Sequence, residues 1–313
     1  MVSFSIMRGL LLLGLSMPVL YKLKGVVSFI LIVANTLVCA VPIMLLALVK
    51  AILPIASVRA VLNLILDRVA TFWIGVNNIN QRLLGRAEVS VSGENTFELN
   101  DWYMVVANHQ SWVDIFILQR LFNGRIPFIK FFLKRELIWV PVIGLAWWAL
   151  EFPFMKRYNS ALLKKRPELK GKDIEVTKKA CEKFKYFPVS IMNFLEGTRF
   201  TESKHQQQAS KYRHLLTPKA GGLSFALNAM DGKLHKLIDV TIVYPQGIPT
   251  FFEYLCGEVS NIKVHIKVMP IEDSLLGDYQ NDAEYRANFQ HWVNVLWQQK
   301  DQEIERLMQT ESK

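Results

Sequence analysis

The sequence predicts an α/β protein whose largely parallel central sheet is flanked by helices and preceded by N-terminal membrane-embedded helices. From residue 87 onward, short runs of β-branched and aromatic residues alternate with segments of helical character. Strands that alternate with helices indicate a parallel sheet covered on both faces. The expected strands are Val89–Val91, Trp102–Ala107, Pro127–Leu133, Val189–Leu195, Leu237–Tyr244 and Ile262–Met269, and the expected helices between them are Trp112–Phe122, Asp173–Phe187 and Pro218–Met230.

The N-terminal region is almost uncharged, which predicts contact with a bilayer. Val26–Val49 contains no charged residue. As a helix it would be about 36 Å long, against a hydrocarbon core of about 30 Å. Gly9–Leu20 is a shorter apolar run that fits either a short membrane-embedded helix or a signal-peptide core. Ala51–Ile79 has apolar residues at helical spacing with interspersed charges, so we expect a helix on the membrane surface or a link to the main domain.

The net charge of +10 is unevenly distributed. Lys156–Lys185 holds 11 Lys/Arg against 4 Asp/Glu. This patch fits anionic headgroups, a phosphorylated substrate or an acidic carrier protein, although a solvated helix and loop would look the same. No nucleic-acid-binding motif accompanies the charge, so nucleic acid is not an expected partner. Basic residues lie on both sides of Val26–Val49, and the positive-inside rule therefore leaves its orientation open.

The cysteine content and the distribution of apolar residues predict the cellular compartment and the division of the chain into regions. The three cysteines are scattered, which argues against a disulfide framework or a thiolate metal site and favours a reducing compartment. Three regions are expected: membrane-associated helices over 1–80, a main domain over 81–272, and a C-terminal amphipathic helix within 273–313, where apolar residues recur at helical spacing. Thr201–Thr217 is polar and contains three consecutive glutamines, which predicts a mobile surface loop.

A histidine and an aspartate follow the expected strand Trp102–Ala107. Five helical steps separate two residues by about 140°, so His109 and Asp114 can meet only if His109 precedes the helix and Asp114 lies in its first turn. Ser111 and Asp114 resemble a capping box with Ser111 as the N-cap. His109 would then lie at the carboxyl edge of the sheet, where an imidazole held by a carboxylate is a general base for a hydroxyl. The alternative is that Asp114 only caps the helix and that His109 is an ordinary loop residue.

A second motif, Glu196-Gly197-Thr198-Arg199, ends the expected strand Val189–Leu195. It places a carboxylate, a flexible backbone and a guanidinium at the same edge of the sheet. Arginine suits bidentate phosphate recognition, and glycine lets a ligand approach the backbone closely. The motif therefore predicts a phosphate-binding turn, and a structural ion pair between Glu196 and Arg199 is the alternative.

A third segment, Leu137–Leu150, is uncharged and carries Trp139, Trp147 and Trp148. Lys134-Arg135-Glu136 precedes it. The composition fits three uses: a groove for an apolar chain, contact with the membrane interface, where tryptophan is favoured, or ordinary core.

In chain order these segments resemble the glycerolipid acyltransferase family, typified by 1-acylglycerol-3-phosphate O-acyltransferases (lysophospholipid acyltransferases). The resemblance covers about Trp102–Gly247, and N-terminal hydrophobic helices are also usual in the family. The wording of the first motif is closest to a subgroup with lysocardiolipin-type and bacterial inner-membrane members. Leu195 stands where the family usually has proline. Four blocks carry the likeness: Asn108–Asp114 and Phe194–Arg199 match the first and third, and Phe154–Arg157 and Val240–Pro245 resemble the second and fourth.

The resemblance implies an O-acyltransferase. His109, oriented by Asp114, would take the proton from the free hydroxyl of a lysophospholipid, such as 1-acylglycerol 3-phosphate, as that oxygen attacks the acyl thioester of acyl-CoA or acyl-carrier protein. No Cys or Ser is placed as an evident covalent nucleophile, so direct attack is expected. No cofactor and no metal is expected. The residues implied in acceptor binding are Arg157, Glu196, Gly197, Thr198 and Arg199.

Membrane lipids are therefore expected partners, and the expected location is a bacterial inner membrane with the catalytic domain facing the cytoplasm. Two other functions stay open from the residues. The same His–Asp pair could activate water in a lipid ester or thioester hydrolase, or the chain could be a non-catalytic module that binds through its basic patch.

Overall fold

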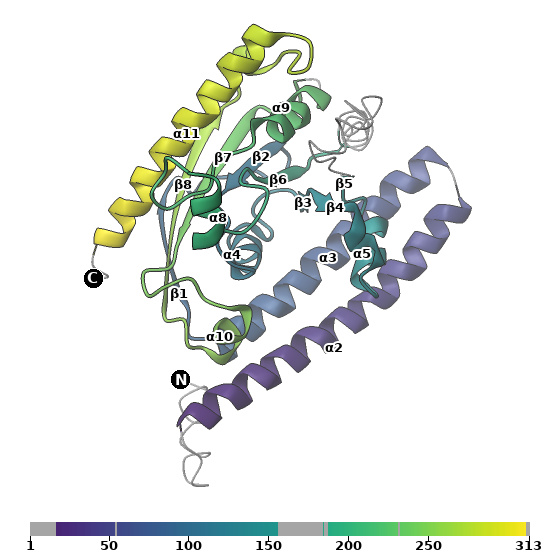
Figure 1. Ribbon diagram of the computed structural model, residues 1–313. Helices are drawn as coiled ribbons and strands as arrows, with labels where there is room; N and C mark the ends of the chain where they lie inside the picture. Colours follow the sequence, from purple (N-terminus) through teal and green to yellow (C-terminus); the bar gives the residue numbers. More distant parts are fainter. Residues whose placement is uncertain (1–16, 54, 156–183, 185–186, 231, 311–313) are drawn as a thin grey trace. The chain divides into compact units, whose positions relative to one another are not determined.

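The computed structural model describes residues 17–53, 55–155, 184, 187–230 and 232–310 (Figure 1). Most of the run Gly9–Leu20, most of the expected helix Asp173–Phe187 and nearly all of the basic patch lie outside the described residues. The chain divides into two compact units. The first draws on Met1–Val91, Ser111–Asn123 and Val243–Val264, and the second on Ser92–Gln110, Gly124–Ile242 and His265–Lys313.

The central sheet has six strands in the order β1-β8-β7-β2-β6-β3. Strand β2 pairs in parallel with β6 and with β7, and β3 pairs in parallel with β6, which confirms the predicted largely parallel α/β sheet. Two further strands, β4 and β5, pair in parallel apart from it. The strands are β1 (Glu88–Gly93), β2 (Tyr103–Ala107), β3 (Ile129–Phe131), β4 (Leu133–Lys134), β5 (Phe154–Met155), β6 (Ser190–Phe194), β7 (Lys236–Val243) and β8 (Asn261–Pro270).

The described helices agree with most of the expected pattern. Helix α4 lies inside the expected Trp112–Phe122, α9 lies inside Pro218–Met230, and α11 forms the predicted C-terminal amphipathic helix. The helices are α2 (Met17–Ile52), α3 (Ala56–Leu84), α4 (Val113–Phe122), η1 (Arg135–Trp139), α5 (Ile143–Ala149), α8 (Glu202–Gln207), α9 (Ala220–Ala229), α10 (Phe251–Cys256), η4 (Asp273–Leu275) and α11 (Ala283–Gln309).

The two N-terminal helices of the first unit, α2 and α3, are long and apolar enough to cross a membrane. They run antiparallel, because Ser28 hydrogen-bonds with Asn80 near one end of the pair and Lys50 donates to Asn63 near the other. Between them, the Asn35 side chain donates to the Trp73 carbonyl at 2.9 Å. Polar contacts of this kind join helices in a membrane, where apolar faces alone give little preference for a neighbour. Helix α3 is thus a packing partner of α2.

The prediction of a surface loop over Thr201–Thr217 is wrong. This segment contains α8 and then turns inward, where Tyr212, Leu215 and Leu216 are buried in the second unit. The polar residues of the segment face outward, and its last apolar residues enter the core. The segment is polar when its seventeen residues are taken together, and this concealed the few apolar residues that enter the core.

Candidate active site

The ends of β2 and β6 bring two of the predicted site residues together in the second unit. Ala107 pairs with Phe194 at the last position of the parallel register. His109 and Glu196 each follow two residues later, so they emerge side by side at the carboxyl edge of the sheet. The main-chain N–H of His109 donates to Glu196 Oε1 at 2.8 Å.

Asn108 fixes the point at which β2 ends. Its side-chain Nδ2 donates to the carbonyl of Ile242 at 2.8 Å, and the N–H of Ile242 donates back to Asn108 Oδ1 at 2.9 Å. The Asn108 side chain is fully buried, and this two-way bond replaces one step of the ladder with β7. The sequence pointed to Asn108 only through the first block of the resemblance, without a role.

The imidazole of His109 is half-buried and stacks on the ring of Phe194, with ring centres 3.9 Å apart and planes at 13°. The carbonyl of His109 accepts from the N–H of Phe200 at 2.7 Å. Both main-chain polar groups of His109 are therefore engaged, which fixes the backbone from which the ring projects. A ring held on one face and reached from outside is a suitable shape for a general base.

Glu196 is fully buried, and each of its carboxylate oxygens accepts a main-chain N–H. Oε1 accepts from His109, and Oε2 accepts from Leu216 at 2.8 Å. Hydrogen bonds to a carboxylate are strong, and a buried charge without them would be very costly. This geometry favours a role for Glu196 in fixing the main chain around His109.

Helix α11 holds in place the segment that contains Leu216, the second main-chain donor to Glu196. The Trp297 indole N–H donates to the carbonyl of Leu216 at 3.1 Å. One turn further along, the Asp301 carboxylate accepts the N–H groups of Arg213 and His214, each at 2.8 Å. Helix α11 therefore supports the candidate site through Leu216, whose N–H donates to Glu196.

The conformation of the turn after Glu196 explains why position 197 is a glycine. Gly197 has φ of 69°, a left-handed conformation that glycine adopts without strain, and its N–H closes the turn onto the carbonyl of Phe194 at 2.9 Å. Arg199 is exposed. Lys204, at the start of α8, donates to Thr198 Oγ1 and to the Arg199 carbonyl, both at 2.9 Å. Sequence reasoning missed Lys204, although its position five residues after Arg199 in a polar stretch was the available signal.

Asp114 lies in the first unit, on α4, and is fully buried. Its Oδ2 accepts the N–H of Ser111 at 2.9 Å, which is the carboxylate half of the predicted capping box. The other half differs. The helix begins at Val113, so its N-cap is Trp112, and the Ser111 hydroxyl accepts from Val113 at 3.2 Å. That hydroxyl also donates to the Pro249 carbonyl at 2.6 Å.

Tyr244 supplies the second partner of Asp114. Its hydroxyl donates to Asp114 Oδ1. Burial first, and then the adjacent Asp114 carboxylate, raise the pKa of Tyr244 well above its usual value. The tyrosine therefore stays protonated and remains a donor. Sequence reasoning placed Tyr244 inside the fourth block but gave it no role.

The structure thus gathers His109, Glu196, Gly197, Thr198 and Arg199 at one edge of the second unit, and it sets Asp114 in the first. Arg157 lies outside the described residues.

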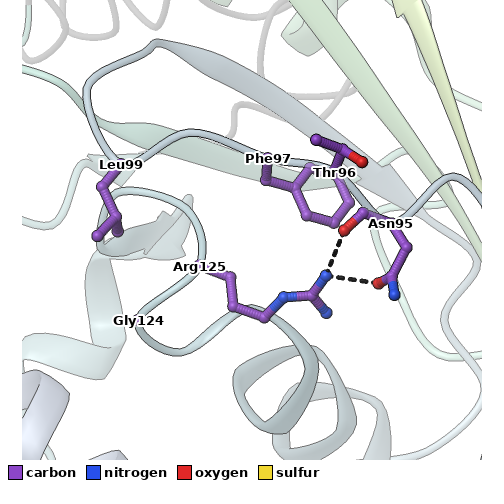
Figure 2. Close-up of a pocket in the computed structure, with 6 residues that line it drawn as sticks. All are labelled: Asn95, Thr96, Phe97, Leu99, Gly124 and Arg125. Atoms are coloured by element: carbon purple, nitrogen blue, oxygen red, sulfur yellow. Dashed lines mark hydrogen bonds between the residues drawn. The ribbon is translucent and has the colours of Figure 1, made fainter.

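A shallow pocket elsewhere in the second unit is unrelated to these residues (Figure 2). Arg125 reaches across it, donating to the Asn95 carbonyl at 2.6 Å, with its guanidinium 5.1 Å from the centre of the Phe97 ring. The residues that line it precede β2 and β3, whereas His109 and Glu196 follow β2 and β6. It therefore lies at the amino ends of the strands and is not the candidate active site.

The fold and this edge define an α/β protein with a candidate general base beside a Gly-Thr-Arg turn. A family model described as "Acyltransferase" matches residues 88–245, half of the chain. The chain belongs to this acyltransferase family.

Curated relatives agree with the family. The chain is 28% identical over 211 residues to mouse 1-acyl-sn-glycerol-3-phosphate acyltransferase gamma, covering 63% of this chain and 51% of the relative. It is 29% identical over 186 residues to 1-acyl-sn-glycerol-3-phosphate acyltransferase 2 of Arabidopsis thaliana, covering 54% and 44%. The chain thus spans about half the length of the curated relatives it matches. The crystal structure of the 1-acyl-sn-glycerophosphate acyltransferase from Thermotoga maritima aligns with a TM-score of 0.47 and 18% identity, covering 93% of this chain and 100% of that one.

Proposed function

We propose that this protein transfers a fatty acyl chain from an acyl thioester to the free hydroxyl of a lysophospholipid such as 1-acylglycerol 3-phosphate. The observation that carries the proposal is the half-buried His109 ring, held over Phe194 and next to the Glu196–Arg199 turn. Membership of the acyltransferase family and the named activities of the relatives support the same reaction.

In the proposed step His109 accepts the proton of the acceptor hydroxyl while the hydroxyl oxygen attacks the thioester carbonyl carbon. The new C–O ester bond forms, the C–S bond breaks, and the thiolate of CoA or of acyl-carrier protein leaves and takes up a proton from the imidazolium. Asp114 orients the imidazole and stabilises its charge, with Tyr244 and Ser111 holding the carboxylate.

The arginines carry the recognition of the acceptor in this proposal. Arg199 binds the phosphate of the lysophospholipid, and Arg157 contributes a second guanidinium. Gly197 and Thr198 let the acceptor approach the turn, and Glu196 acts by holding that turn against His109. The donor is acyl-CoA or acyl-carrier protein.

We also propose that the chain resides in a bacterial inner membrane, with the second unit on the cytoplasmic side. Two helices long and apolar enough to cross a membrane support the membrane location. Acyl-CoA and acyl-carrier protein are cytoplasmic donors, which favours that side for the site.

The test is acyl transfer by His109→Ala in reconstituted membranes, with His291→Ala as the matched control because His291 is an exposed histidine on α11. General-base catalysis contributes about 10²–10⁴ in rate, so we expect a loss of that order for His109→Ala and none for His291→Ala. Undiminished transfer by His109→Ala contradicts the proposal.

Labelled acyl thioester supplied with and without lysophospholipid separates transfer from hydrolysis. The proposal expects label to leave the thioester only when the acceptor is present. Release of free fatty acid at the same rate without acceptor would instead establish a hydrolase.

A further inference from the structure

The segment formed by η1 and α5, called here the η1–α5 surface, presents its large apolar side chains outward. Trp139 is 85% exposed, Leu145 is 53% exposed and Trp148 is 54% exposed. Leu145 and Trp148 are three residues apart on α5 and therefore share one face of the helix. Side chains of this size rarely lie this open to water in a soluble domain, and such a cluster marks an interaction surface.

This surface is firmly built. Pro141 and the carbonyl of Val140 close the turn into α5, since Ile143 N–H donates to the Pro141 carbonyl at 2.7 Å and Gly144 N–H to the Val140 carbonyl at 2.8 Å. A Cβ on Gly144 would lie 2.2 Å from the carbonyl oxygen of Ile138, so only glycine allows η1 and α5 to pack this closely. The outward position of the tryptophans follows from this packing.

The inner side of the same segment joins the core of the second unit. Trp147 contacts Phe152, with ring centres 6.4 Å apart, and Phe152 stacks on Phe131 of β3 at 6.5 Å. Phe131 in turn stacks on Phe194 at 6.2 Å, and Phe194 carries the ring of His109. A continuous row of aromatic rings therefore links the η1–α5 surface to the candidate general base.

Charge and residue type indicate what covers the surface. Lys134 and Arg135 are exposed directly before Trp139, with Glu136 the one acid among them. Tryptophan is favoured at the level of lipid headgroups, and neighbouring Lys/Arg are attracted to anionic headgroups.

We propose that the η1–α5 surface is a second membrane contact of this protein, through which the second unit itself lies in the headgroup region of an anionic bilayer. Trp139 and Trp148 enter the interface, and Lys134 and Arg135 bind anionic lipid phosphates. The contact is separate from the N-terminal helices, and it does not depend on the reaction proposed above.

Tryptophan quenching by brominated lipids tests this contact. The full chain is placed in vesicles of phosphatidylethanolamine and phosphatidylglycerol with brominated acyl chains, as wild type and as the double variant Trp139→Phe/Trp148→Phe. Phenylalanine keeps the apolar bulk, and thermal unfolding verifies that the fold is retained. We expect the emission lost in the double variant to be the quenched component, so the quenched fraction falls.

Trp292→Phe is the matched control, because Trp292 lies on α11 of the same unit against Phe289, with ring centres 5.6 Å apart. Removing this tryptophan should leave the quenched fraction unchanged or raise it. A quenched fraction that does not fall in Trp139→Phe/Trp148→Phe overturns the proposal, and that outcome is also expected if a second copy of the chain covers the surface. The readout needs no acyl transfer, so it stands or fails independently of the enzymatic proposal.

Charge-reversal variants test whether the surface prefers anionic lipids. Lys134→Glu/Arg135→Glu should lower the quenching of wild-type tryptophans in vesicles that contain phosphatidylglycerol, and should have a smaller effect in phosphatidylcholine alone. Equal effects in the two lipids would contradict the role of the anionic headgroups.

Discussion

Two carboxylates of this protein, Glu196 and Asp114, are fully buried in the same chain but are held in different ways. Glu196 in the second unit accepts two main-chain N–H groups, from His109 and Leu216. Asp114 in the first unit accepts one main-chain N–H, from Ser111, and one side-chain hydroxyl, from Tyr244. Main-chain donors move only with the fold, whereas a side-chain donor can be changed by a single substitution.

The difference makes the roles proposed for the two carboxylates separable by experiment. A carboxylate that accepts two main-chain N–H groups fixes the path of the chain, so Glu196 holds the main chain at His109 in place. Asp114 is held partly by the Tyr244 hydroxyl, and we propose above that it assists the reaction. Removing the charge of each residue should therefore have separable effects on rate and on stability.

The largest effect is expected for Asp114→Asn. Loss of the acid that orients the histidine of a Ser-His-Asp triad lowers kcat by about 10⁴, and here we expect a loss that approaches, and does not exceed, that of His109→Ala. Steady-state kinetics with labelled acyl thioester would measure it. A kcat within threefold of wild type would mean that Asp114 only caps α4 and that the comparison with Glu196 is void.

Glu196→Gln should come next and should act on stability as well as rate. The amide would meet one of the two main-chain N–H groups with a donor, and an unsatisfied buried group costs about 1–3 kcal/mol. A displaced His109 should lower kcat by about 10²-fold, since small errors of position are costly in catalysis. Thermal unfolding in detergent and kinetics would report both. If the variant kept its stability and kcat and showed only a raised KM, Glu196 would act in acceptor binding instead of in fixing the main chain.

Tyr244→Phe should have a smaller effect, because Asp114 keeps its bond to Ser111. The lost hydrogen bond to a charged group is worth about 1.5–3 kcal/mol, and we expect kcat to fall by about tenfold.

The same variant should change the alkaline limit of stability. The folded-state pKa of Tyr244 is raised, so its contribution is fully present below the unfolded pKa near 10 and is lost as pH rises toward the folded value. Unfolding measured at pH 9 and at pH 11 should show a steeper loss for the wild type than for Tyr244→Phe. Parallel losses would mean that the hydroxyl does not titrate with unfolding.

The smallest effect on rate is expected for Trp297→Phe, which removes the N–H that donates to the Leu216 carbonyl and leaves a cavity where the larger buried indole stood. The lost hydrogen bond contributes about 1 kcal/mol and the cavity adds to it, so stability should fall by more than that amount while kcat falls by only a few-fold. Trp292→Phe on the same helix is the control and should change neither. A loss of activity as large as that of Glu196→Gln would mean that α11 reaches the site by more than this bond.

The local sequence pattern was sufficient to predict the strands and the residues that follow their ends. The apolar run before Asn108 is strand β2, and the run before Glu196 is strand β6, so His109 and Glu196 were correctly placed beyond strand ends. The same reasoning failed at Thr201–Thr217, where Leu215 and Leu216 are buried and the Leu216 carbonyl accepts from Trp297 of α11. It also misplaced the cap by one residue, since α4 begins at Val113 with Trp112 as its N-cap.

The sequence by itself determined the alternation of strands and helices, the apolar N-terminal helices and the positions of His109 and Arg199 after buried strands. These follow from periodicity, which is a property of neighbouring residues. Only the tertiary structure decided that Asn108 bonds Ile242, that Tyr244 donates to Asp114 and that α11 supports Leu216. Each of these contacts joins residues more than eighty positions apart, and strand order and helix packing, which no local pattern encodes, select such partners.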